Sequence, residues 1–396
     1  MAILSFFAIL LLIAFPLNEV GRISPMLHVS FTLLDVVVGI GAGAWLLWQL
    51  LQRKFPHTMQ AKAFGLTVII FVLSLLVNIR TLTTSQFMEA ALYIVRWLCY
   101  GTLFFMVFHS SISLKKNIER FLFGGGVLLL LFGYLQFFMY PELRNLYYAG
   151  WDVDYYRMFA TFFDPNFFGL FLVLFFLFVV AKCTKIQFKQ EQVKFILYIL
   201  LEAATFFAIL LSYSRTALIS LVIGVVILFW QKRLKKYILP FFVGTALFVV
   251  IVFTLGTAKL NVNSLFRTTS SYARITSAQH AITIFSQNPL LGVGFNAYRY
   301  AQYRLHFMPG SALREDHGAS GTDVSMLFVL ATSGIIGFVV FLYFLYSHFY
   351  AVLHAKNRLG LATITAWIVG SLFINGLFYP SLLVWVWVLL GITTSE

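Results

Sequence analysis

Long apolar runs alternate with short polar breaks along almost the whole chain. Most of these runs approach the roughly 20 residues that a helix needs to cross a bilayer, and no strand-like alternation accompanies them. The pattern predicts an all-α polytopic integral membrane protein with about twelve transmembrane helices. The expected spans are 2–17, 31–51, 63–79, 87–108, 120–139, 166–181, 194–211, 216–230, 237–256, 323–348, 361–377 and 381–394.

Composition supports a membrane protein. Of the 396 residues, 61% are hydrophobic and only 11% are charged, whereas soluble domains carry about 25% charged residues. The first run, Ala2 to Leu17, has no basic segment before it and no clear cleavage site, so we interpret it as a retained helix. The two cysteines, Cys99 and Cys183, provide neither a disulfide framework nor metal-ligand spacing.

The net charge of +14 would suit a nucleic-acid partner, but the distribution of the lysines argues against one. Lysines concentrate in every second loop, and the positive-inside rule places these loops, together with both termini, in the cytoplasm. We therefore expect an inner-membrane protein with cytoplasmic termini and no nucleic-acid partner. The basic residues of these loops are Arg53, Lys54, Lys62, Lys115, Lys116, Arg120, Lys182, Lys185, Lys189, Lys194, Lys232, Arg233, Lys235, Lys236, Lys356 and Arg358.

The opposite set of loops carries arginine almost exclusively, with Lys259 as its only lysine. Arginine binds phosphate through a planar fork of donors that lysine lacks, so this set indicates phosphate recognition. The alternative is that the arginines only balance the acidic residues of the same loops. The arginines are Arg22, Arg80, Arg144, Arg157, Arg215, Arg267, Arg274, Arg299, Arg304 and Arg314.

Two of these outer loops are long. The loop from Tyr140 to Pro165 is rich in aromatic residues, which either stack on sugars or form an interfacial belt. The loop from Thr257 to Thr322 is long enough to be functional. Within it, a helix is expected over 270–286, with an apolar stripe that can lie on the membrane surface and with Asn288-Pro289 after its end. The stripe consists of Tyr272, Ile275, Ala278, Ile282 and Phe285.

Two arginines are expected at helix N-termini on the same face of the membrane. Arg215 follows a very short turn and begins the next span, and Arg274 is expected in the first turn of the loop helix. A cation beside the unpaired N–H groups of a helix start is unfavourable unless an anion also binds there. The pair therefore points to a phosphate or pyrophosphate, the alternative being that each arginine pairs with a carboxylate such as Asp152 or Asp164.

Five polar residues are further candidates for chemistry or structure. Asp164 precedes Pro165 and fits the N-cap of the next helix, while Asp323 lies at the start of another span. His317 is either a base or a solvated loop residue. Within the bilayer, Arg96 and Glu202 either serve a pathway or form a structural ion pair with each other, and we favour the ion pair.

Four segments, in order, resemble the O-antigen ligase and polymerase superfamily of bacterial membrane glycosyltransferases. They are RMFATFFDPN from Arg157, LSYSRTAL from Leu211, YARITSAQHAITIFSQNPLLGVGF from Tyr272 and GTDVSMLFVLATSGIIG from Gly321. The resemblance implies a GT-C-like fold and a glycan donor on an undecaprenyl-pyrophosphate carrier. Ligases of the superfamily pass the glycan to lipid A-core, and polymerases extend a polysaccharide.

The resemblance also implies roles for individual residues. Arg215 and Arg274 fall on the arginines of the family, and Arg157 and Asn166 of the first segment are expected to bind substrate. Family ligases carry a histidine eleven residues before the glycine at Gly334, where this chain has Asp323. Peptidoglycan-polymerising shape and elongation proteins have a similar Thr-Asp motif, so the departure favours a polymerase or another transferase over a ligase.

These features predict an inverting glycosyltransferase without metal or other cofactor, acting on the extracytoplasmic face. Asp323, rather than His317, is expected to deprotonate the acceptor hydroxyl of a glycan or of lipid A-core. Arg215 and Arg274 are expected to stabilise the leaving pyrophosphate. A flippase or other transporter is the alternative, but no repeat relates the two halves of the chain and the long loop favours an enzyme.

Overall fold

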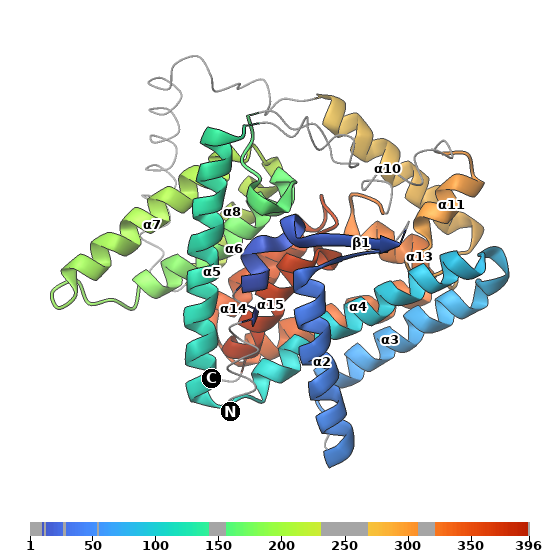
Figure 1. Ribbon diagram of the computed structural model, residues 1–396, viewed down its shortest axis with the longest axis horizontal. Helices are drawn as coiled ribbons and strands as arrows, with labels where there is room; N and C mark the ends of the chain where they lie inside the picture. Colours follow the sequence, from blue (N-terminus) through green and yellow to red (C-terminus); the bar gives the residue numbers. More distant parts are fainter. Residues whose placement is uncertain are drawn as a thin grey trace.

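The computed structural model describes residues 10–11, 13–26, 29–53, 55–141, 156–230, 268–307 and 321–394. Within these residues, seven helices are long and apolar enough to cross a membrane, and three shorter apolar helices accompany them (Figure 1). The long helices are α2 (Leu33–Gln52), α3 (Met59–Val77), α4 (Thr84–Phe108), α5 (Ile112–Met139), α6 (Pro165–Cys183), α7 (Gln192–Leu211) and α13 (Ser325–His354). The shorter ones are α8 (Arg215–Leu228), α14 (Arg358–Gly370) and α15 (Pro380–Thr393).

This architecture confirms the predicted all-α polytopic membrane protein. Each helix overlaps one expected span, although α14 ends at Gly370 rather than near residue 377. The expected span 237–256 lies outside the described residues, as does most of 2–17, so the total of about twelve stays a prediction. Of the aromatic cluster expected in the loop between α5 and α6, Tyr156 is described, whereas Tyr147, Tyr148, Trp151 and Tyr155 lie outside the described residues.

Two helices form the centre of the bundle. Residues of α6 are buried along nearly its whole length, and all of α15 is buried. A helix that is apolar on every side needs either lipid or neighbouring helices around it, and for α6 and α15 the neighbours supply this surrounding. In this centre the indole of Trp385 meets the rings of Phe171 and Phe175 edge-on, with centroids 5.2 and 5.8 Å away. Aromatic packing therefore joins α6 to α15.

A short hairpin precedes α2 and was not predicted. Strands β1 (Arg22–Met26) and β2 (Val29–Thr32) pair antiparallel, with Arg22 opposite Thr32. Thr32 also caps α2, since its hydroxyl accepts from the Asp35 N–H while the Asp35 carboxylate accepts from the Thr32 N–H. Short 3-10 turns complete this end of the bundle: η1 (Asn18–Gly21), η2 (Ile79–Thr81), η4 (Ala160–Phe162) and η7 (Gly376–Phe378).

Outside the span-length helices lie α10 (Thr268–Gln287) and α11 (Tyr298–Arg304). The first covers the range expected for the loop helix and ends directly before Asn288-Pro289. Tyr272, Ile275 and Ile282 of its apolar stripe are 71%, 55% and 54% exposed, so this face is free to meet a membrane surface. The helix packs against α13 and α11.

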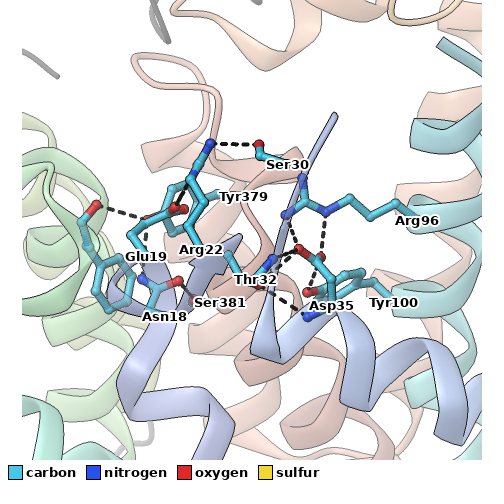
Figure 2. A network of polar contacts seen from close by, with 11 residues as sticks. Asn18, Glu19, Arg22, Ser30, Thr32, Asp35, Arg96, Tyr100, Tyr379 and Ser381 are labelled. Carbon is cyan, nitrogen blue, oxygen red and sulfur yellow. Dashed lines mark hydrogen bonds and ion pairs between the residues drawn. The ribbon is translucent and has the colours of Figure 1, made fainter. Parts of the chain in front are cut away.

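The expected pairing of Arg96 with Glu202 is wrong. Arg96 forms a two-pronged ion pair with Asp35, at 2.6 Å from Nε to Oδ1 and 2.8 Å from Nη2 to Oδ2 (Figure 2). The reason is that α4 packs on α2, which carries the Asp35 carboxylate, whereas Glu202 lies on α7. The hydroxyl of Tyr100 donates to Asp35 Oδ1, at 2.8 Å.

Candidate active site at one end of the bundle

The turn between α7 and α8 places Arg215 at the first position of α8, as predicted. Ser214 caps the helix by accepting from the Ala217 N–H, and Tyr213 adopts a left-handed conformation with φ 49°. The turn rests on α6 because Gly169 has no side chain: a Cβ there would lie 2.8 Å from Ser212 Oγ. Arg215 itself is exposed.

Arg157 attaches the segment before α6 to this turn. Its side chain is 8% exposed, and Nε donates to the Ser212 carbonyl oxygen at 3.0 Å. Nη2 donates to Asn166 Oδ1 at 3.3 Å, and the next backbone amide, of Met158, donates to the Leu211 carbonyl oxygen. Both residues expected to bind substrate, Arg157 and Asn166, thus also shape the site by binding each other.

Asp164 is the N-cap of α6, as predicted from Asp164-Pro165. Its Oδ1 accepts from the Asn166 N–H at 2.6 Å and from the Phe167 N–H at 3.3 Å. Pro165 occupies the first helical position, where no backbone donor is lost. The cap fixes a carboxylate at the helix start, on the same segment as Arg157.

The third part of the site is the contact between α10 and the start of α13. Ser277 Oγ accepts from the Asp323 N–H at 3.3 Å and donates to Thr322 Oγ1 at 3.2 Å. Arg274 lies three residues earlier, so it shares a face of α10 with Ser277. Asp323 precedes Val324, the N-terminal boundary residue of α13, and is therefore adjacent to the helix rather than within its first turn.

Charged residues from several chain segments influence the pKa of Arg274. Burial lowers the pKa of its guanidinium, Asp323 raises it most strongly, and Arg215, Asp164 and Arg157 exert smaller effects. The pKa of Asp323 is raised by burial and lowered by Arg274. Three arginines and two carboxylates from separate parts of the chain therefore lie within electrostatic reach of one another around Arg274, with an excess of positive charge.

The expected place of Arg274 in its helix is wrong. Because α10 begins at Thr268, Arg274 lies in the second turn, and the helix start does not explain its unfavourable position. Its charged form is disfavoured instead by burial and by the neighbouring Arg215 and Arg157, and Asp323 is the carboxylate that favours this charge most. The alternative in which carboxylates balance the arginines thus holds for Arg274 in part. Asp152 and His317 lie outside the described residues.

Sequence reasoning missed three residues that shape the site. Ser277 holds Asp323, and the buried Tyr298 of α11 directs its hydroxyl to the Ser277 carbonyl oxygen at 3.5 Å. Tyr379 stacks on Phe162 and Phe167, which precede and follow Asp164 in the sequence, with ring centroids 5.5 and 4.2 Å away. The spacing of Ser277 from Arg274 on one helix face was the only available signal.

Tyr379 also joins the site to a buried polar network (Figure 2). Its hydroxyl donates to the Phe162 carbonyl oxygen at 3.2 Å and accepts from Asn18 Nδ2 at 3.3 Å. Beside it Glu19 binds Arg22, with 2.7 Å from Nε to Oε2. Burial raises the pKa of Glu19, and Arg22 opposes that effect. The network braces the segment that carries Asp164.

The site has the chemistry to hold a diphosphate ester and to activate a hydroxyl group. Guanidinium groups neutralise anionic oxygens, and a carboxylate of raised pKa can accept a proton. Among the residues that the structure describes, no group of three or more His, Cys, Asp and Glu side chains is placed to hold a metal ion.

Comparison with known proteins identifies the segment that contains most of this chemistry. Residues 200–342 match the family model described as O-antigen ligase, which confirms the resemblance to the O-antigen ligase and polymerase superfamily. Arg215, Arg274 and Asp323 lie within the match, whereas Arg157, Asp164 and Asn166 precede it. A comparison with curated proteins found no match.

Proposed function

We propose that this chain, whose residues 200–342 match the O-antigen ligase family model, transfers a glycan from an undecaprenyl-pyrophosphate carrier to a sugar hydroxyl. The proposal is carried by Ser277, which binds the Asp323 N–H one helical turn after Arg274, and by the electrostatic influence of Asp323 and Arg215 on Arg274 within the matched segment. A diphosphate leaving group needs fixed positive charge, and an attacking hydroxyl needs a base, so the cluster supplies both requirements of one reaction.

In the proposed reaction, Asp323 accepts the proton of the acceptor hydroxyl. The hydroxyl oxygen attacks the anomeric carbon from the face opposite the pyrophosphate, so that the configuration inverts. The bond between that carbon and the bridging oxygen breaks, and its electron pair leaves with the carrier pyrophosphate. Arg215 and Arg274 stabilise the charge that develops there, and the mechanism requires no metal.

Arg274 links donor binding to the strength of the base. Before the donor binds, the guanidinium lowers the pKa of the Asp323 carboxyl. A bound pyrophosphate then interacts with the same guanidinium, and this weakens the electrostatic effect of Arg274 on Asp323. The pKa of the carboxyl rises, and it becomes a stronger base when a leaving group is in place. Proton abstraction is thereby favoured in the donor complex.

The identity of residue 323 favours a polymerase over a ligase. The superfamily's ligases have histidine at this spacing, and this chain has Asp323. We therefore assign the growing polysaccharide as the preferred acceptor and lipid A-core as the less favoured one. The lysine pattern supports a site on the extracytoplasmic face, with both termini in the cytoplasm.

Transport without bond formation is less well supported. Transporters use the unwound backbone of broken helices to hold their solute. The helix α13 is broken at Gly334, but backbone groups at the break bind residues 289–294 of the chain itself. The break therefore has an internal structural role.

The proposal is tested with purified protein in nanodiscs, lipid-linked glycan donor, and either polysaccharide or lipid A-core acceptor. Mass spectrometry should detect an extended glycan and free undecaprenyl pyrophosphate in equal amounts. Both products should be more abundant with the polysaccharide acceptor than with lipid A-core. Unchanged donor with every acceptor, while the same protein moves lipid-linked glycan across proteoliposomes, would establish the transporter instead.

A further inference from the structure

The break in α13 is a crossing of two backbones. At Gly334, with φ 66° and ψ −172°, the helical pattern is interrupted. The Ile335 and Ile336 amides donate instead to the carbonyl oxygens of Pro289 and Leu290, at 2.8 and 3.3 Å. In return, the amides of residues 293 and 294 donate to the carbonyl oxygens of residues 331 and 332, at 3.1 and 3.0 Å. We call residues 289–294 and 331–336 the crossing.

Glycine makes this contact possible. A Cβ on Gly334 would lie 2.3 Å from the Leu290 carbonyl carbon, and a Cβ on Gly292 would lie 2.3 Å from that of Thr332. Both glycines have positive φ, which other residues rarely adopt. The two backbones thus touch directly, and neither segment can shift without breaking hydrogen bonds of the other.

Two buried polar side chains of α3 hold the crossing from a third direction. Ser74 Oγ lies 2.7 Å from the carbonyl oxygens of both Leu291 and Thr332. Asn78 Nδ2 donates to the Gly292 carbonyl oxygen at 2.9 Å. Ser74 lies in the last turn of α3 and Asn78 directly follows its last residue, and we call these two residues the α3 polar pair.

The crossing and the Ser277 contact are separate tethers between α10 and α13. Ser277 holds Asp323 beside Arg274, and the crossing begins two residues after α10 ends at Gln287. Two tethers at different points along a helix fix its angle as well as its distance from a neighbour. The α3 polar pair attaches the second tether to the main bundle.

We propose that the α3 polar pair, Ser74 and Asn78, are positioning residues that set the separation of Arg274 and Asp323 through the crossing. This inference rests on the proposed function. Neither residue is among the arginines and carboxylates of the candidate site, so the effect of Ser74 and Asn78 on glycan transfer is indirect. A small displacement of reacting groups costs up to about 100-fold in rate, which makes the geometry consequential.

The test compares two substitutions that each remove one buried hydroxyl from α3. Ser74→Ala removes the bonds to the crossing. Thr67→Val is the matched control, because the Thr67 hydroxyl donates at 2.8 Å to the Ala63 carbonyl oxygen within the same helix. Spin labels replace Ile282 of α10 and Tyr346 of α13, which are 54% and 55% exposed, after both native cysteines are changed to serine.

Ser74→Ala should lower kcat by about 10- to 100-fold, leave the donor KM within about threefold, and broaden the measured distance distribution. Thr67→Val should change none of these. If Ser74→Ala does not fold, Asn78→Ala removes the bond to Gly292 and is measured in the same way.

Unchanged kcat and an unchanged distance distribution in the folded variant would overturn the inference. So would equal losses in Ser74→Ala and Thr67→Val, because these would reflect weakened packing of α3. The distances are measured without turnover. An inactive wild-type protein that still shows the Ser74-dependent broadening would therefore refute the proposed function while retaining the structural role of the pair.

Discussion

Replacing Asp323 by asparagine removes the proposed base while preserving its shape. The contacts that fix this position survive, because the Asp323 backbone N–H donates to Ser277 Oγ and the neighbouring Thr322 hydroxyl accepts from Ser277 and from the Val324 N–H. Fold and donor binding should therefore persist. Loss of a general base should lower kcat by at least about 100-fold, which corresponds to about 2.7 kcal/mol of activation free energy.

The assay measures release of undecaprenyl pyrophosphate from the lipid-linked donor at saturating acceptor. His317→Gln is the comparison, since His317 is the other candidate base suggested by the sequence, and it should cost much less activity than Asp323→Asn. The reverse order would make His317 the base and reduce Asp323 to a residue at a helix start. Equal wild-type rates in both variants would refute general-base catalysis by either residue.

Three further predictions concern the charges of the site. Arg215→Ala and Arg274→Ala should each abolish most turnover in folded protein, with partial rescue by lysine, and a wild-type rate in Arg274→Ala would reduce that residue to a surface charge. Because the carboxylate is the active base, kcat/KM should fall as pH drops through the pKa of Asp323, which burial raises above its ordinary value. Arg274 lowers this pKa, so the residual activity of Arg274→Gln should fall at a higher pH than that of the wild type. An unchanged pH profile would show that Arg274 does not influence the base. Activity should survive EDTA, whereas loss that Mg²⁺ or Mn²⁺ restores would show that a metal carries the charge.

The sequence predicted the parts of the fold that depend on composition and local pattern. Apolar runs located the long helices, because the cost of an unpaired backbone in lipid leaves few alternatives to a helix. Asp164-Pro165 located a helix start, because the cap and the proline each act within one turn. Arg215 was placed correctly at the start of α8 for the same local reason.

The sequence could not predict contacts between distant segments. Arg96 pairs with Asp35 rather than Glu202 because α4 packs on α2, a choice that apolar patterns do not encode. The break at Gly334 was also missed, since the residues around it are as apolar as the rest of α13. Its hydrogen bonds depend on residues 289–294, which only the folded chain brings near.

The most direct test of the central claim follows the bridging oxygen between the sugar and the pyrophosphate. The lipid-linked donor is labelled with ¹⁸O at this position, and the released carrier is examined by mass spectrometry. Attack at the anomeric carbon leaves the label in undecaprenyl pyrophosphate, which is the result we predict, with one labelled carrier for each new glycosidic bond. Label retained in the glycan, or glycan extension without carrier release, would contradict the proposed transfer.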